Sequence, residues 1–200
     1  MTLLTNESIA QWISELDYQL MQRNMLIHQI KGTALKDLNG RVMPRLLRSI
    51  WLKLGKKHNR NVAVKGWKSI NEETFDIPHP TVPNLSLGMD VSYYLDNKLI
   101  ALIEAKSNYP MGVEKSILDV HYLKQIQPEI VHMFVTVTTF STRGNSKDRM
   151  NKQLAEAEGL ELWSFTNMIR SQFDKRWETK SKIPPTGIVP FIDRVERLLI

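Results

Sequence analysis

The feature that most constrains the fold is a short apolar run that carries charge only at its end. Residues 99–103 read Leu-Ile-Ala-Leu-Ile, and Glu104, Ala105 and Lys106 follow them. An apolar run of this length predicts a strand buried on both faces of a sheet, where an unpaired carboxylate or ammonium is costly. Because side chains alternate along a strand, Glu104 and Lys106 are expected to point to the same side. Charges in such a place need a partner or a function.

A second strand, beginning at Asp90, is expected to add another carboxylate. Residues 90–94 are followed by the turn sequence Leu95-Asp96-Asn97, which predicts an antiparallel hairpin with the run that ends at Lys106. In this hairpin two carboxylates, from Asp90 and Glu104, converge with one lysine.

The spacing of Asp90 and Glu104-Ala105-Lys106 resembles the two-part motif of the PD-(D/E)XK nuclease superfamily, whose fold is called restriction endonuclease-like. Met89 precedes Asp90, where this family often has proline. The short half of the motif also occurs at residues 96–98 and 178–180, but neither copy ends an apolar run. The resemblance implies an α/β fold with an αβββαβ core, which here follows an N-terminal helical segment.

The same resemblance implies an active site built on a divalent metal ion. Its catalytic residues are Asp90, Glu104 and Lys106, and its metal ligands are Asp90, Glu104 and the backbone carbonyl of Ala105. The implied cofactor is Mg²⁺, with Mn²⁺ as a substitute, and Lys106 is expected beside the attacking water. Some members of the family use an additional acid from the preceding segment. The candidates for it in this chain are Glu73 and Glu72, with Glu15 as a third.

Composition agrees with a metal held by oxygen atoms. The chain has no cysteine, which excludes disulfides and thiolate metal sites. Its histidines show no paired metal-ligand spacing. No stretch approaches the length of a membrane span, and the N-terminus lacks the basic and apolar regions of a signal peptide. We therefore expect a cytoplasmic protein that does not bind membranes.

Positive charge is concentrated in one part of the chain. Residues 31–68 hold eleven Lys or Arg residues against one acid, a net charge of +10, whereas the whole chain carries +6. Such an asymmetry is typical of proteins that bind the phosphate backbone of DNA. The phosphate-binding candidates in and around this segment are Arg45, Arg48, Lys56, Lys57, Arg60, Lys65 and Lys68. A later polar loop and the start of the following helix add Arg143, Asn145, Lys147 and Arg149 as candidates for reading bases or for ordinary helix capping.

Apolar periodicity predicts helices that alternate with strands. The expected helices are 7–30, 44–55, 113–127 and 146–158, with a last amphipathic helix around Ile192 and Val195. The expected strands outside the hairpin are 62–64, 130–138 and 160–163, and the expected loops include 76–83 and 139–145. This order predicts a mixed β-sheet flanked by helices on both faces. The resemblance implies that residues 1–200 form one nuclease domain. Its parts are a basic helical segment (1–60), a catalytic core (61–165) and a C-terminal helical extension (166–200).

Three functions are compatible with these features. The first is a Mg²⁺-dependent endonuclease that hydrolyses double-stranded DNA, most simply a type II restriction enzyme acting as a homodimer on a specific sequence. The second is a structure-specific or repair nuclease, such as a resolvase, on the same fold. The third is a DNA-binding protein in which Asp90, Glu104 and Lys106 are structural, or a binder of some other polyanion.

Overall fold

The computed structural model describes residues 4–34, 40–66, 73–77, 85–106, 113–136, 146–165 and 187–200. The helices in these ranges are α1 (Asn6–Lys31), α3 (Val42–His58), α4 (Val113–Ile126), α5 (Ser146–Glu158) and α6 (Ile188–Glu196). The strands are β1 (Val62–Lys65), β2 (Glu73–Ile77), β3 (Leu85–Met89), β4 (Val91–Leu95), β5 (Lys98–Lys106), β6 (Val131–Thr136) and β7 (Leu160–Ser164). No helix in this part of the chain combines the length and apolar character needed to cross a bilayer.

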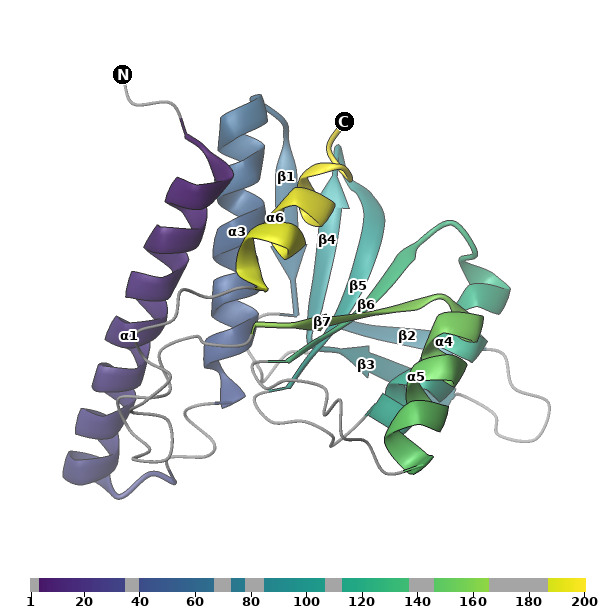
Figure 1. Ribbon diagram of the computed structural model, residues 1–200, viewed down its shortest axis with the longest axis horizontal. Coiled ribbons are helices and arrows are strands. Elements are labelled where there is room, and N and C mark those ends of the chain that lie inside the picture. The colour runs from purple at the N-terminus through teal and green to yellow at the C-terminus, as the bar shows by residue number, and fades with distance from the viewer. Residues whose placement is uncertain are drawn as a thin grey trace.

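A mixed five-stranded sheet forms the centre of the fold (Figure 1). Its strand order is β1-β4-β5-β6-β7, with antiparallel pairing from β1 to β5 and parallel pairing from β5 to β7. The parallel half requires crossover connections, which α4 and α5 supply. Strands β2 and β3 form a separate antiparallel pair. The predicted α/β class with a mixed sheet is confirmed.

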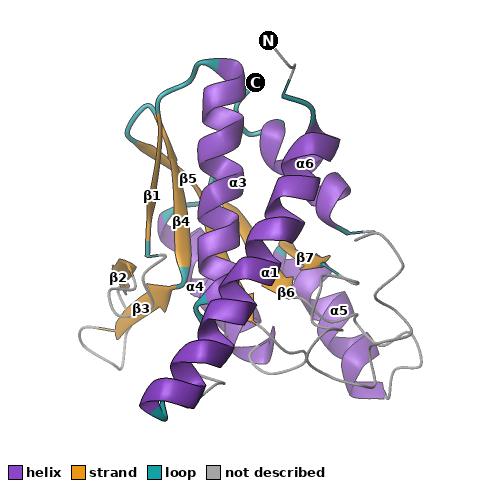
Figure 2. Cartoon of the chain, turned by 90° about the vertical axis from the view of Figure 1, so that its left-hand side faces the viewer, coloured by secondary structure: helices purple, strands orange, loops and turns teal. Residues whose placement is uncertain are grey.

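Helices cover both faces of this sheet. On one face α1, α3 and α6 share a large apolar core with inward-facing residues of β4, β5 and β6, including Tyr93 and Ile103. Tyr93 is fully buried, stacks on Trp51 of α3 and donates a hydrogen bond to the Leu47 carbonyl oxygen at 2.7 Å. The opposite face, which includes Phe134, packs against α4 and α5. Figure 2 looks onto α3 and α1, which lie in front of the sheet.

Most predicted elements occur with small changes at their ends. Helix α5 has the predicted bounds, and Gly159 follows it with φ of +69°, as expected for a terminating glycine. Helix α3 is longer than predicted at both ends. Pro44 can lie two residues inside its start, because backbone N–H groups in the first turn of a helix have no intrahelical partner and proline's missing N–H costs nothing there. Gly55 does not end this helix. It lies where a Cβ would approach a Val62 methyl group to 2.2 Å, so it permits close packing of β1.

The loop predicted over residues 76–83 is wrong at its start. Asp76 and Ile77 belong to β2 and pair with Ser86 and Leu85 of β3, a strand that was not predicted. The proline-rich sequence begins at Pro78, one residue past the end of β2, so it does not interfere with this pairing. The loop predicted at 139–145 lies outside the described residues.

Candidate active site

A tight hairpin turn joins β4 to β5, as predicted. Leu95 pairs with Lys98, which leaves Asp96 and Asn97 as a two-residue loop with φ of 49° and 65°. Two successive positive φ values define a type I′ turn, in which asparagine and aspartate are tolerated better than most residues. The turn is therefore specified locally by the sequence.

A β-bulge then shifts the register of this hairpin by one residue. Tyr94 pairs with Leu99, but Tyr93 pairs with Ala101, so Ile100 has no partner on β4. Such bulges redirect side chains and often occur beside functional sites. After the bulge the pairing is regular and reaches Val91 opposite Ile103.

The bulge decides which side chains share a face with Glu104. Extending the observed register by one residue places Asp90, which lies between β3 and β4, directly opposite Glu104. Opposite residues of an antiparallel pair project from the same face. Without the bulge, Asp90 would lie opposite Ile103, whose side chain points into the core on the other face. The extra residue at Ile100 therefore brings the two carboxylates together.

Lys106 connects both acids. Its Nζ lies 3.3 Å from Asp90 Oδ2 and forms a close ion pair with Glu104 Oε1. The Ala105 backbone N–H donates a hydrogen bond of 2.9 Å to Asp90 Oδ2. The Glu104 side chain is 8% exposed, against 15% for Asp90 and 34% for Lys106, so the ammonium is the most accessible of the three groups. The structure thus brings together the three residues that the motif singled out.

Burial and the close approach of two carboxylates make ionisation of this site unfavourable. Burial, together with the nearby Asp90 carboxylate, raises the pKa of Glu104 to about 7, although Lys106 opposes the shift. Burial would lower the pKa of Lys106, but the two carboxylates outweigh it and raise this pKa above its usual value, so Lys106 stays protonated. Near neutral pH the Glu104 carboxyl is therefore poised between its protonated and ionised forms. Perturbed groups of this kind are concentrated at functional sites.

The residues present fit a hard divalent cation such as Mg²⁺. A backbone N–H and C=O of one residue point to the same edge of a strand, so the hydrogen bond from Ala105 N–H to Asp90 puts the Ala105 carbonyl on the side of the acids. Mg²⁺ binds through one or two carboxylates and retains several waters. Among the described residues no group of three or more His, Asp or Glu side chains could hold a metal ion, and at this site the side-chain ligands would be Asp90 and Glu104. A cation between these acids would offset the repulsion that raises the Glu104 pKa.

Of the proposed additional acids, Glu73 begins β2 of the neighbouring hairpin. The backbone of Glu73 pairs with that of Met89, one residue before Asp90, so β2 runs beside the site. The side chain of Glu73 and the whole of Glu72 lie outside the described part of the chain.

Lys115 of α4 is a neighbour of the site that the sequence motif did not indicate. Its Nζ lies 2.7 Å from Asp119 Oδ2, and Asp119 is almost fully buried. Burial would lower the pKa of Lys115, but Asp119 and Glu104 raise it, while Lys106 opposes them. Lys115 is therefore close enough to Glu104 to favour its ionised form. The signal in the sequence was an i, i+4 lysine–aspartate pair in the first helix after Lys106.

The candidate phosphate-binding residues separate into groups. Lys57 and Arg60 lie near the hairpin turn, where Lys57 pairs with Glu196 and Arg60 with Asp96. This end of β4 is about 16 Å from the acids, at roughly 3.3 Å per residue. Lys56, in the same region, is exposed. Lys68, Arg143 and Asn145 lie outside the described residues, as do the side chains of Lys147 and Arg149, whose backbones begin α5.

Three other candidates lie nearer to the acids. Lys65 ends β1, pairs in register with Ser92 and holds its Nζ 4.5 Å from the centre of the Tyr94 ring. Arg45 and Arg48 lie in the first half of α3, which begins at the end of the molecule opposite the hairpin turn (Figure 1).

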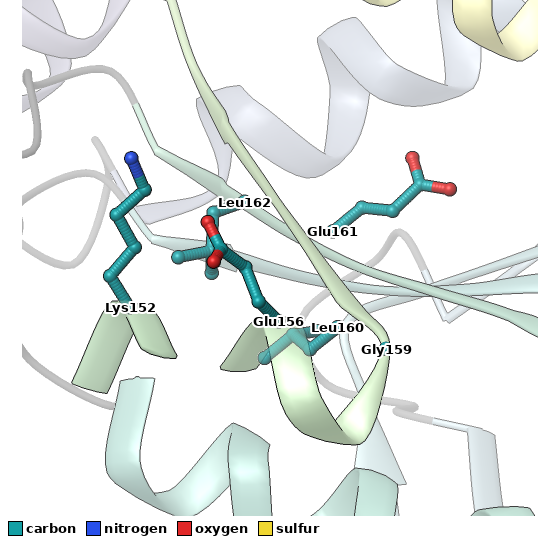
Figure 3. Close-up of a pocket in the computed structure, with 6 residues that line it drawn as sticks. All are labelled: Lys152, Glu156, Gly159, Leu160, Glu161 and Leu162. Atoms are coloured by element: carbon teal, nitrogen blue, oxygen red, sulfur yellow. The ribbon is translucent and has the colours of Figure 1, made fainter. Parts of the chain in front are cut away.

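A hollow at the β7 edge is separate from these residues. It has a volume of about 450 Å³ and is lined by Lys152, Glu156, Gly159, Leu160, Glu161 and Leu162. Figure 3 shows the Glu161 side chain pointing away from Lys152 and Glu156. Glu161 forms an ion pair with Arg194 of α6 at 2.6 Å. None of the three motif residues lines this hollow.

No protein-family model, curated protein or solved structure matches this chain.

Proposed function

We propose that this protein is a Mg²⁺-dependent DNA endonuclease with a PD-(D/E)XK-type active site. The observation that carries the proposal is the convergence of Asp90, Glu104 and Lys106 at the end of a buried hairpin, in the register set by the bulge at Ile100. The order α3-β1-β4-β5-α4-β6 supports it, because this is the αβββαβ order of the restriction endonuclease-like core, with the β2–β3 pair inserted.

The chain's own residues suit phosphodiester hydrolysis. When bound, Mg²⁺ supplies an activated water and neutralises charge on the phosphate. Asp90, Glu104 and the Ala105 carbonyl would hold the ion. Lys106 keeps a compact positive charge beside both acids, where it stabilises negative charge that develops on the attacking oxygen and the phosphate. Lysine suits this role better than arginine, whose charge is spread over a planar fork.

We further propose a type II restriction enzyme that acts as a homodimer on double-stranded DNA. A domain that carries both a basic stretch and a candidate active site can bind and cut DNA by itself, and a two-fold dimer cuts both strands of a palindrome with two copies of one site. Incubation of the purified protein with plasmid DNA and Mg²⁺ tests this proposal. Discrete fragments that EDTA abolishes are expected.

The other outcomes of the digest separate the alternatives. Nicking or cutting only of branched or damaged DNA would replace the restriction enzyme with a structure-specific nuclease. Binding of DNA without cleavage in either Mg²⁺ or Mn²⁺ would contradict the nuclease and leave a DNA-binding protein.

A further inference from the structure

A group of three arginines lies where α1 packs against the start of α3. Arg41 precedes the first residue of α3, and Arg45 follows one helical turn later, so the two lie on the same face of the helix. Arg23 comes from the second half of α1. Figure 2 shows α1 crossing in front of the lower half of α3, the half that contains Arg45.

The positive charge of this group is not compensated within the described part of the chain. Arg45 is half-buried, and burial together with the charges of Arg23 and Arg41 lowers its pKa. No ion pair joins any of the three to an acid there. The first turn of α3 also contains no acidic residue, so the positive end of its dipole adds to the same potential.

Several other cations of this protein form ion pairs with carboxylates. Lys57, Arg60 and Arg194 each lie within 3.0 Å of a carboxylate oxygen. Like charges one turn apart on a helix cost free energy. A partly buried arginine beside two others, with no carboxylate paired to it among the described residues, is a place where a bound anion would relieve repulsion.

The position of the group favours an extended polyanion. Arg60, just past the end of α3, bonds to Asp96 at the hairpin turn, so α3 begins at the opposite end of the molecule. Strand β5 ends at that same lower end with Lys106 (Figure 1). The arginines and the three motif residues therefore flank one end of the sheet from its two faces.

We propose that Arg23, Arg41 and Arg45 together form a phosphate-binding site for the backbone of a nucleic acid. The site rests on the proposed function only in taking DNA as the polyanion. It assigns a contact to two arginines of the basic stretch 31–68 and adds Arg23, which lies before that stretch in the sequence. It also assigns no such contact to Lys57 or Arg60, which are paired internally.

Binding of a duplex oligonucleotide in Ca²⁺, followed by fluorescence anisotropy over a range of salt concentrations, tests this site without cleavage. Each neutralised phosphate contact lowers the slope of log K against log salt by about 0.9. The triple variant Arg23→Gln, Arg41→Gln, Arg45→Gln is therefore expected to have a slope less negative by about 2 to 3. Its affinity at low salt should be at least tenfold weaker. For Arg41→Gln alone, the slope should be less negative by about 1.

Matched controls come from the other end of the molecule. Arg197 and Lys98 are exposed there, and Arg197→Gln and Lys98→Gln remove the same charge, so they should leave the slope unchanged. A second readout is thermal stability at low salt without DNA. Arg41→Gln should raise the melting temperature because it relieves repulsion, whereas Arg197→Gln should not.

The outcomes separate the possible sources of phosphate. If the triple variant binds the duplex as Arg197→Gln does, the nucleic-acid site is wrong, even where inorganic phosphate stabilises the wild type and not the variant. A wild type that binds no duplex also overturns it. Loss of binding in the triple variant, in a protein that never cleaves DNA, would support this site and contradict only the nuclease.

Discussion

The two ends of the β4–β5 hairpin use charge in opposite ways. At the turn end Arg60 bonds to Asp96 at 3.0 Å and to the Leu199 carbonyl oxygen at 2.9 Å. Glu196 there accepts hydrogen bonds from Asn6, Lys57 and His58. Burial alone would raise the pKa of Glu196, but these donors lower it to about 2.

At the open end the balance is reversed. Burial and the second carboxylate raise the pKa of Glu104, and burial and like charges lower that of Arg45. The comparison teaches that net charge alone is a poor guide to function in this protein. Charges at the turn end stabilise the ionised forms and join α1, α3 and α6, whereas charges at the open end are held at a cost that a metal ion and a phosphate would offset.

Of the substitutions at the two ends, a replacement of Glu104 should have the largest effect on cleavage. We expect Glu104→Gln to reduce Mg²⁺-dependent cleavage by on the order of 10³-fold, since it removes a metal ligand. The same variant should be more stable than the wild type in EDTA at pH 8, because it has no buried carboxylate to ionise. Cleavage assays and urea unfolding check these expectations.

The pH dependence gives the sign of this effect. A carboxyl whose pKa is raised on folding keeps its proton in the native state while the unfolded state loses it, so stability falls as pH rises from about 4.5 to about 7. This fall should be smaller in Glu104→Gln. A variant that is less stable than the wild type at pH 8 would contradict the account of this end.

Replacing Glu196 should have the opposite effect on stability. Glu196→Gln is expected to lower the free energy of unfolding by about 1–3 kcal/mol at pH 7, because Lys57 and His58 lose a charged partner. Cleavage should stay within about twofold of the wild type, because Glu196 lies at the turn end of the hairpin, about 16 Å along β4 from the acids. Glu129→Gln, an exposed position, serves as the control.

The pH dependence of this end also runs the other way. A carboxyl whose pKa is lowered on folding adds stability above about pH 4.5, and this stability is lost as pH falls toward 2. The difference between wild type and Glu196→Gln should therefore shrink in acid. A difference that persists at pH 2 would show that the ionised carboxylate is not its source.

Replacing Lys115 should have a smaller effect, confined to the open end. Its charge favours the ionised form of Glu104, so Lys115→Gln should raise the Glu104 pKa further. We expect cleavage at pH 7 to fall several-fold and to recover at higher pH, where Glu104 ionises in both proteins. The pH profile of kcat measures this shift, with Lys152→Gln as a control on the exposed surface of α5. A uniform loss at every pH would indicate a structural role instead.

The sequence predicted the parts of the site that depend on local geometry. The apolar run identified β5, the alternation of side chains put Glu104 and Lys106 on one face, and Asp96-Asn97 specified the turn. The bulge was not predicted. Regular pairing from this turn would have set Asp90 opposite Ile103, and no local signal marks Ile100 as the extra residue.

Contacts between segments far apart in the chain could not be predicted from the sequence either. Lys57 and Arg60 read as phosphate contacts within a basic segment, yet their partners include Glu196 and the Leu199 carbonyl, about 140 residues later in the chain. Arg23 lies outside the basic stretch 31–68 and comes near Arg45 only because α1 packs on α3. Charge patterning along a chain does not distinguish a paired cation from an uncompensated one.

The central claim is that the charges at the open end form a metal-dependent nuclease site, and Lys106→Ala tests it most directly. Cleavage of plasmid DNA in Mg²⁺ and binding of the same DNA in Ca²⁺ are measured for the wild type, Lys106→Ala and Lys98→Ala, which removes an exposed lysine at the turn end of the same strand. We predict that Lys106→Ala abolishes cleavage and retains binding, whereas Lys98→Ala leaves both cleavage and binding at the wild-type level. Unchanged cleavage in Lys106→Ala, or no cleavage by the wild type, would contradict the claim.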